Sequence, residues 1–125
     1  MTPSDLRTGT GADVALDEDA LTLTTRTGQD GTVTVSVAGE VDTFTGPTLR
    51  SALDSELERQ PPELVLDLRG IRFLGSAGLA VLVQTQVSAG ARGIALRLIA
   101  TTRPVIRPLE VTGLLDLFTV TSDPR

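Results

Sequence analysis

Residues 63–83, ELVLDLRGIRFLGSAGLAVLV, constrain the fold of this chain more than any other segment. An apolar run at 64–68 predicts a strand, and its near-continuous hydrophobicity favours a central position in a sheet. A short loop containing glycine follows, and an apolar helix is predicted to begin directly after Ser76. Ser is a favoured N-cap residue, because its oxygen accepts a bond from an unpaired N–H of the first helical turn. The segment therefore predicts a strand–loop–helix unit with the Ser76 hydroxyl at the positive end of the helix dipole.

The rest of the chain alternates between strand and helix patterns. Residues 21–26 and 32–38 flank an Asp-Gly turn and predict a β-hairpin. An amphipathic helix is expected to begin near Pro47, because Leu49, Leu53 and Leu57 recur at intervals of four. The later elements are a helix at 77–89 that Gly90 ends, a strand at 94–99 and an edge strand at 118–120. Between these two strands, a helix is expected to follow Thr102 and to stop at Gly113. It should be short or bent, because it contains Pro108.

This order predicts one α/β domain, with a four- or five-stranded mixed sheet and helices mainly on one face. Residues 1–20 lack apolar periodicity and are expected to form a flexible tail, which leaves residues 21–122 for the domain. Loops that follow parallel neighbouring strands lie at the same edge of a sheet. The loop at 39–45 and the loop before Ser76 should therefore lie together.

Composition excludes several classes of function. The 125 residues include no Cys, no His and no Lys, which removes thiol chemistry, disulfides, and the most common metal ligand and general base. The net charge is −5 and aromatic residues are 2% of the chain, a poor basis for binding nucleic acid. No apolar run is long enough to cross a bilayer, and no signal-peptide core is present. We expect a cytoplasmic protein without cofactor or metal, and either a monomer or a weak dimer.

Catalytic interpretations are weakly supported. A nucleophile elbow needs Gly two residues before the serine, where this chain has Leu74, and no His is available to activate Ser76. A Walker phosphate-binding loop needs a Lys. Asp67 is a single carboxylate without a clustered partner, so it is poor evidence for a metal site. We expect no enzymatic activity.

Three segments, at 39–53, 64–83 and 103–118, resemble the STAS domain, and most of all the bacterial anti-sigma factor antagonists, also called anti-anti-sigma factors. The resemblance covers roughly residues 20–122. Such proteins bind an anti-sigma factor that is also a protein kinase, so that the sigma factor is released. The kinase then phosphorylates the antagonist on a serine in the pattern Asp-Ser-Ser/Thr-Gly-Leu, and the two proteins separate.

The resemblance implies a role for particular residues. The pattern falls on residues 75–79, so the phosphoacceptor role passes to Ser76, while Gly75 stands at the acidic position and Ala77 at the second hydroxyl position. The acidic partner-contact residue of the first loop corresponds to Asp42. The implied partner surface comprises Asp42, Thr43, Gly75, Ser76, Ala77 and Gly78.

Purely structural interpretations of the same residues remain open. The alternative for Ser76 is a plain helix cap, and the alternative for Asp42 is a turn residue that satisfies its own backbone. The alternative for Gly75 and Gly78 is that close packing of the backbone needs glycine there. The alternative function is an unswitched STAS interaction module, either a scaffold subunit or a domain that senses a small molecule. Phosphorylation of Ser76 by a partner kinase separates the two functions.

Overall fold

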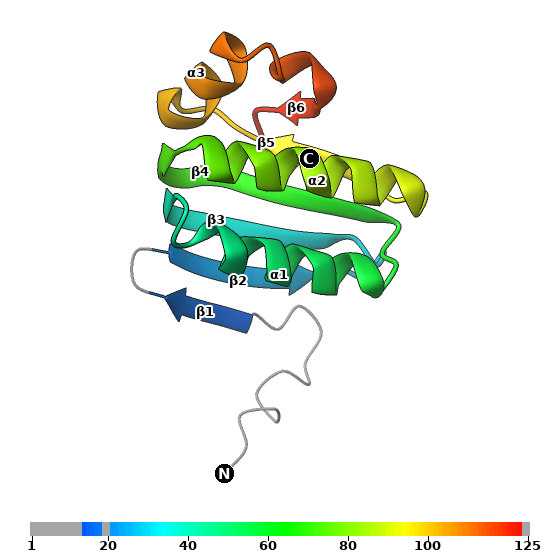
Figure 1. Cartoon of the computed structure of the whole chain (residues 1–125). Coiled ribbons are helices and arrows are strands. Elements are labelled where there is room, and N and C mark those ends of the chain that lie inside the picture. The colour runs from blue at the N-terminus through cyan, green and yellow to red at the C-terminus, as the bar shows by residue number, and fades with distance from the viewer. Residues whose placement is uncertain (1–13, 19–20, 124–125) are drawn as a thin grey trace.

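The computed structural model describes residues 14–18 and 21–123. Strands and helices alternate over most of this range (Figure 1). The elements are β1 (Val14–Glu18), β2 (Leu21–Thr27), β3 (Val33–Val41), α1 (Gly46–Glu58), β4 (Glu63–Leu74), α2 (Ser76–Ala91), β5 (Ala95–Ile99), α3 (Arg103–Val111), the 3-10 helix η2 (Leu115–Leu117) and β6 (Thr119–Thr121). Within the described residues, none of the helices has the length and apolar character needed to cross a membrane.

The strands form one mixed sheet in the order β1-β2-β3-β4-β5-β6. β1, β2 and β3 pair antiparallel, whereas β3-β4, β4-β5 and β5-β6 pair parallel. This confirms the predicted fold class. The described sheet has six strands, one more than the upper limit predicted from the sequence.

The additional strand is β1, Val14–Glu18, which the sequence analysis assigned to the tail. It pairs with β2 from Val14 opposite Thr25 to Glu18 opposite Leu21. Its alternation of apolar and polar residues is too weak to predict a strand, and backbone pairing with an available sheet edge places it. The other residues of the predicted tail, 1–13 and 19–20, lie outside the described residues.

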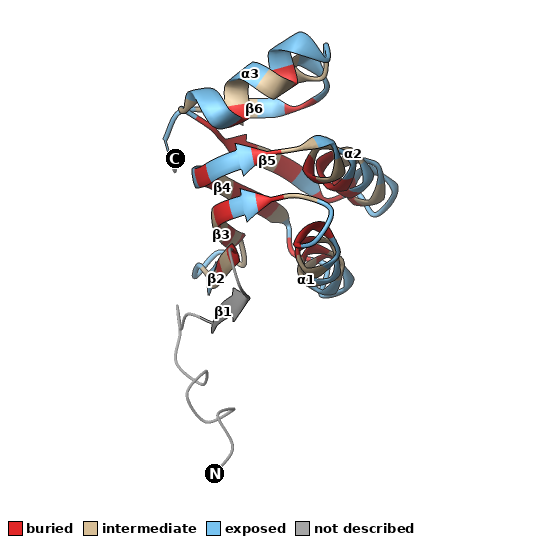
Figure 2. Cartoon of the chain, turned by 60° about the vertical axis from the view of Figure 1, so that its left-hand side comes forward, coloured by how far each residue is buried: buried red, intermediate tan, exposed pale blue. Residues whose placement is uncertain are grey.

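Helices α1 and α2 cover one face of the sheet (Figure 1), and their buried residues face it (Figure 2). The predicted stripe of Leu49, Leu53 and Leu57 is at most 1% exposed. β5 pairs with β4 only as far as Asp67, and helix α3 contacts β4 where this pairing has ended. Helix α3 buries Val105 and Leu109. The core is therefore built mainly from aliphatic side chains, with Phe118 as an aromatic member, as expected for a chain with few aromatic residues.

Several element boundaries differ from the sequence prediction, and the largest differences are at β3, β4 and α2. β3 continues to Val41, past the predicted end at residue 38. β4 continues to Leu74, because irregular pairing at 36–40 of β3 lets it stay hydrogen-bonded through the segment predicted as a loop. Gly90 lies inside α2, which ends at Ala91. The left-handed conformation after this helix is taken by Gly93, with φ +71°. At α3 the prediction is confirmed, since Gly113 follows the helix with φ +75°.

Candidate functional site

The loops that carry the predicted site residues meet at one edge of the sheet. β3 and β4 are parallel neighbours, so both loops leave from the carboxyl ends of adjacent strands. The Gly75 N–H donates to the Val41 carbonyl at 2.9 Å and joins the two loops directly. Gly46 also lies close to α2, since a Cβ placed on it would be 3.6 Å from the Ala77 Cβ. The expectation that the two loops share an edge is confirmed.

The β3–α1 loop is organised by Asp42 and Thr45. Asp42 Oδ1 accepts bonds from the N–H groups of Phe44 and Thr45, both at 2.9 Å. The Thr45 hydroxyl accepts from the Asp42 N–H at 3.1 Å and donates to the Glu40 carbonyl at 2.8 Å. This reciprocal pair resembles a capping box, and the Asp42 carbonyl accepts the helical bond of the Gly46 N–H at 2.8 Å. The loop conformation is thus held from within.

The same bonds set the charge of the loop. The Thr45 N–H, more than any other group, stabilises the carboxylate and lowers the pKa of Asp42 below its ordinary value of 3.8. Asp42 is therefore ionised at neutral pH. Its side chain is half-buried. Since one oxygen serves the loop, the interpretation of Asp42 as a residue that satisfies its own backbone is supported by the geometry.

Ser76 is exposed and is the first residue of α2 rather than its N-cap. The N-cap is Gly75, which has extended backbone angles (φ −89°, ψ −177°) and whose carbonyl accepts the Leu79 N–H at 3.0 Å. No side chain caps this helix. The prediction that the Ser76 hydroxyl caps α2 is therefore wrong, because the chain enters the helical conformation one residue earlier.

The remaining predicted residues differ in exposure. Thr43 is exposed and Ala77 is half-buried. Gly78 is buried, and a Cβ on it would lie 2.5 Å from Leu74 Cδ1 and 2.7 Å from Val41 Cγ1. Its contribution to the site is to bring the start of α2 close to the sheet, which agrees with the packing interpretation of this glycine.

Sequence reasoning missed Thr45, Phe44 and Phe73. Thr45 could have been found, since an acidic residue followed three positions later by a hydroxyl residue before a helix is close to the capping-box pattern. Phe44 is 80% exposed in the β3–α1 loop, and Phe73 is 52% exposed at the end of β4. Their exposure could not have been predicted, because aromatic residues are ordinarily assigned to the core.

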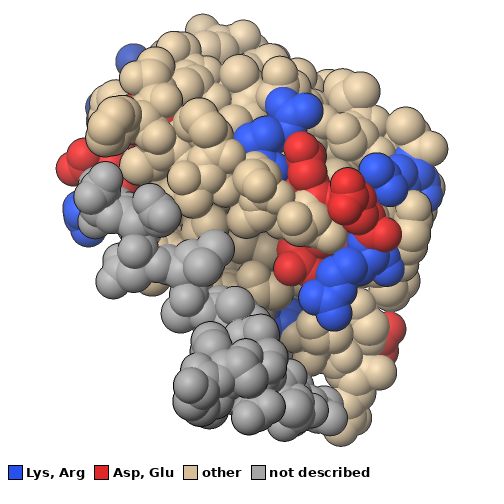
Figure 3. Space-filling view, turned by 60° about the horizontal axis from the view of Figure 1, so that its bottom comes forward, with Lys and Arg blue, Asp and Glu red and all other residues tan. Residues whose placement is uncertain are grey.

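Acidic and basic side chains are interleaved on the face shown in Figure 3, so neither sign dominates there. Asp67 forms an ion pair with Arg69, whose Nε and Nη2 donate to its two oxygens at 2.9 and 2.7 Å. The Arg69 hydrogen bonds lower the pKa of Asp67. Both oxygens of the carboxylate considered as a metal ligand are thus occupied by the neighbouring guanidinium.

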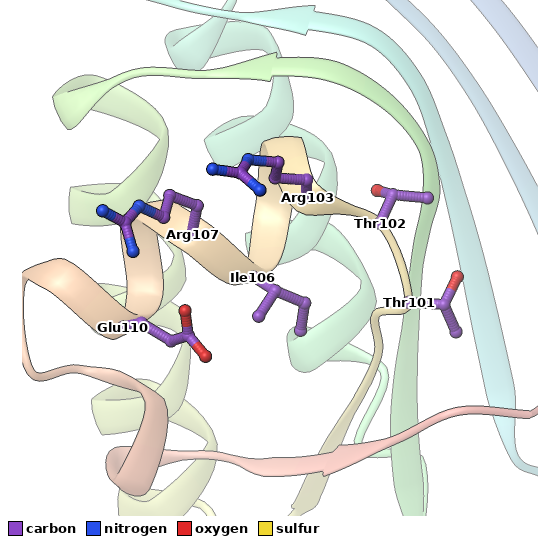
Figure 4. A pocket seen from close by; sticks show the side chains of 6 residues that line it. All are labelled: Thr101, Thr102, Arg103, Ile106, Arg107 and Glu110. Carbon is purple, nitrogen blue, oxygen red and sulfur yellow. The ribbon is translucent and has the colours of Figure 1, made fainter.

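A cavity of about 290 Å³ lies against α3 (Figure 4). Its lining comes from α3 and the residues just before it: Thr101, Thr102, Arg103, Ile106, Arg107 and Glu110. None of the predicted site residues lines this cavity.

Residues 24–124 match the STAS domain. The anti-sigma-F factor antagonist RsfB of Mycobacterium tuberculosis is 31% identical over 100 residues, which are 80% of each protein. The anti-sigma-B factor antagonist of Bacillus subtilis is 31% identical over 90 residues, 72% of this chain and 82% of that one. The crystal structure of an anti-sigma factor antagonist from Mycobacterium paratuberculosis has a TM-score of 0.78 at 33% identity and covers 86% of this chain and 91% of that chain. The fold, the match of residues 24–124 to the STAS domain and the similarity to these relatives agree, and the chain therefore belongs to the STAS domain family.

Proposed function

We propose that this chain is an anti-anti-sigma factor that binds an anti-sigma factor with serine kinase activity and is released when that kinase phosphorylates Ser76. The observation that carries the proposal is the position of Ser76: exposed, at the start of α2, with no capping bond to its hydroxyl. The relatives named as anti-sigma factor antagonists support the class of partner.

The site suits a reversible charge switch. The Ser76 oxygen would take the γ-phosphoryl group of ATP, ADP would leave, and the hydroxyl proton would pass to the kinase or solvent. The product carries about −1.5 to −2 charges at neutral pH. The N-terminus of α2, which has no acidic residue in its first turn, offsets part of this charge by about 0.3–1 kcal/mol per interaction. The free protein should therefore stay folded.

The interface responds differently, because a phosphate there must lose water and is placed on the edge that also carries ionised Asp42. An interface penalty of about 3–4 kcal/mol weakens binding by more than two orders of magnitude. Phosphorylation is thus expected to change affinity for the partner much more than it changes stability.

The test is incubation of the chain with candidate kinase-type anti-sigma factors and ATP, followed by mass spectrometry and titration calorimetry. We expect one phosphate on Ser76 and loss of binding after modification. Ser76→Ala should bind and resist modification, while Ser51→Ala, a control at an exposed serine of α1, should behave as wild type. Phosphate at another residue, or tight binding by the fully phosphorylated protein, would contradict the switch. No binding of the unmodified chain to any such factor would contradict the function as a whole.

A further inference from the structure

The described residues expose two of the three aromatic side chains in the chain. Phe44 is 80% exposed and Phe73 is 52% exposed, whereas Phe118 is 8% exposed and belongs to the core. Single exposed apolar residues are common on protein surfaces. Here the exposed rings come from the same edge of the sheet, where the loops around Asp42 and Ser76 meet.

Both rings are attached to backbone that is hydrogen-bonded or paired within the fold. The Phe44 N–H donates to Asp42 Oδ1 at 2.9 Å, inside the hydrogen-bonded loop before α1. Phe73 pairs with Glu40 in the last part of β4. Phe44 lies in the loop that follows β3, and Phe73 lies near the end of the adjacent parallel strand β4, so both residues come from the same edge of the sheet. Presenting them to a partner requires little ordering of the backbone, which lowers the entropic cost of binding.

The Phe73 ring also lies against the backbone that precedes Ser76. A Cβ on Gly75 would be 3.0 Å from Phe73 Cε2 and 3.3 Å from Cζ. The absence of a side chain at Gly75 therefore leaves room for the ring beside the first residue of α2. A group that binds this ring is brought next to the Ser76 hydroxyl.

We propose that Phe44 and Phe73 are the apolar anchors by which the edge around Ser76 holds its kinase-type anti-sigma factor, an inference that rests on the proposed function. Exposed aromatic side chains contribute large contact area, and a few buried anchors supply most of the affinity of an interface. The acidic side chains of Glu40 and Asp42 adjoin these anchors, so the fitting partner surface has apolar pockets with a basic rim. A phosphate on Ser76 would place charge near the Phe73 ring, which must lose water on binding.

A second copy of this chain fits the surface less well. Two Phe side chains bury at most about 150–250 Å² each, whereas a stable interface buries about 800 Å² per partner. The anchors by themselves are too small for any stable interface, and two copies facing each other here would bring the acidic side chains of Glu40 and Asp42 of both copies together. They serve a partner that adds contacts from its own surface, as a kinase enclosing Ser76 must do.

The test uses Phe44→Ala, Phe73→Ala and the double variant, with Val87→Ala and Val111→Ala as controls. The control valines are 66% and 62% exposed on α2 and α3, away from the edge. Titration calorimetry with the anti-sigma factor that phosphorylates Ser76 should show each Phe variant weakened about 10- to 30-fold and each Val variant less than about threefold. Thermal unfolding should be unchanged for Phe44→Ala, whose ring is 80% exposed, and should change only slightly for Phe73→Ala, whose ring is 52% exposed.

Each outcome separates this inference from the proposed function. If the wild type binds and the Phe variants bind equally well, the anchors are overturned and the function stands. If the wild type binds no anti-sigma factor, both fall. If light scattering shows a wild-type dimer that the Phe variants convert to monomer without a change in partner affinity, the occupant of the surface is a second copy and the inference is overturned.

Discussion

Thr45 holds the β3–α1 loop together, although its side chain carries no charge. It is 5% exposed, and its hydroxyl bonds the Asp42 N–H and the Glu40 carbonyl. Two backbone groups therefore depend on one buried hydroxyl. A buried donor or acceptor left without a partner costs about 1–3 kcal/mol.

Replacing Thr45 with Val should lower the free energy of unfolding by about 1–3 kcal/mol, because the methyl keeps the volume and removes both bonds. Urea unfolding followed by circular dichroism measures this change. The control is Thr43→Val at an exposed position of the same loop, which should stay within about 0.5 kcal/mol of wild type. Equal stability of the two variants would show that the Thr45 bonds do not organise the loop.

Ser76→Ala gives the opposite expectation for a hydroxyl at the start of a helix. No side chain caps α2, so removing the Ser76 hydroxyl should change the free energy of unfolding by less than about 0.5 kcal/mol. The same urea titration tests it. A loss near 1 kcal/mol, the usual effect of deleting a cap, would mean that Ser76 caps the helix in solution.

At the scale of elements, the close approach of α2 to the sheet depends on a glycine as well as on large apolar side chains. Gly78 lets the first turn of α2 approach Leu74 and Val41, which are 5% and 0% exposed. Gly90, near the other end of the same helix, has no neighbouring atom within 4 Å of the place a Cβ would take. The two glycines thus occupy opposite environments in one helix.

Alanine at these two positions should act in opposite directions. Gly78→Ala should lower the free energy of unfolding by about 1–3 kcal/mol, because the added methyl overlaps the packed core. Gly90→Ala should raise it by roughly 0.5–1 kcal/mol through helix propensity alone. Parallel denaturant titrations compare the two variants. A stabilising Gly78→Ala would indicate that α2 does not lie as close to the sheet as described.

At the scale of the whole molecule, the free energy of unfolding depends on pH through three Asp residues whose pKa values change on folding. The pKa values of Asp30, Asp42 and Asp67 are lowered in the fold by hydrogen bonds from Thr32, Thr45 and Arg69 respectively. A carboxyl whose folded pKa is depressed stabilises the protein above its unfolded pKa, here 3.8. That contribution is lost as the pH falls through the folded pKa.

Stability should therefore be steady near neutral pH and should fall in acid below about pH 4. The variant Asp42→Asn keeps an oxygen for the loop N–H groups and removes the charge. It should be less stable than wild type at pH 7, and the difference should shrink as the pH falls below the ordinary carboxyl pKa of 3.8. Thermal unfolding across a pH series measures the difference. A gap that stays constant into strong acid would remove Asp42 from the acid response.

The sequence predicted most of the elements and predicted that the two loops of the candidate site share one edge, because both predictions depend on local patterns. The Leu stripe of α1 and the alternating valines of β3 report which faces are buried. Parallel strands on either side of α1 then require the loops after β3 and β4 to share an edge. Asp42 and Ser76 could be assigned to one surface from these patterns alone.

Only the tertiary structure decided the details at that edge. Gly75 and Ser76 are both acceptable N-caps, and the structure makes Gly75 the N-cap and Ser76 the first residue of α2. The exposure of Phe44 and Phe73 depends on which segments cover the strand ends, and no sequence pattern encodes that. β1 is a strand because a neighbouring edge offers hydrogen bonds to its backbone, and backbone bonds carry no signature in side-chain order.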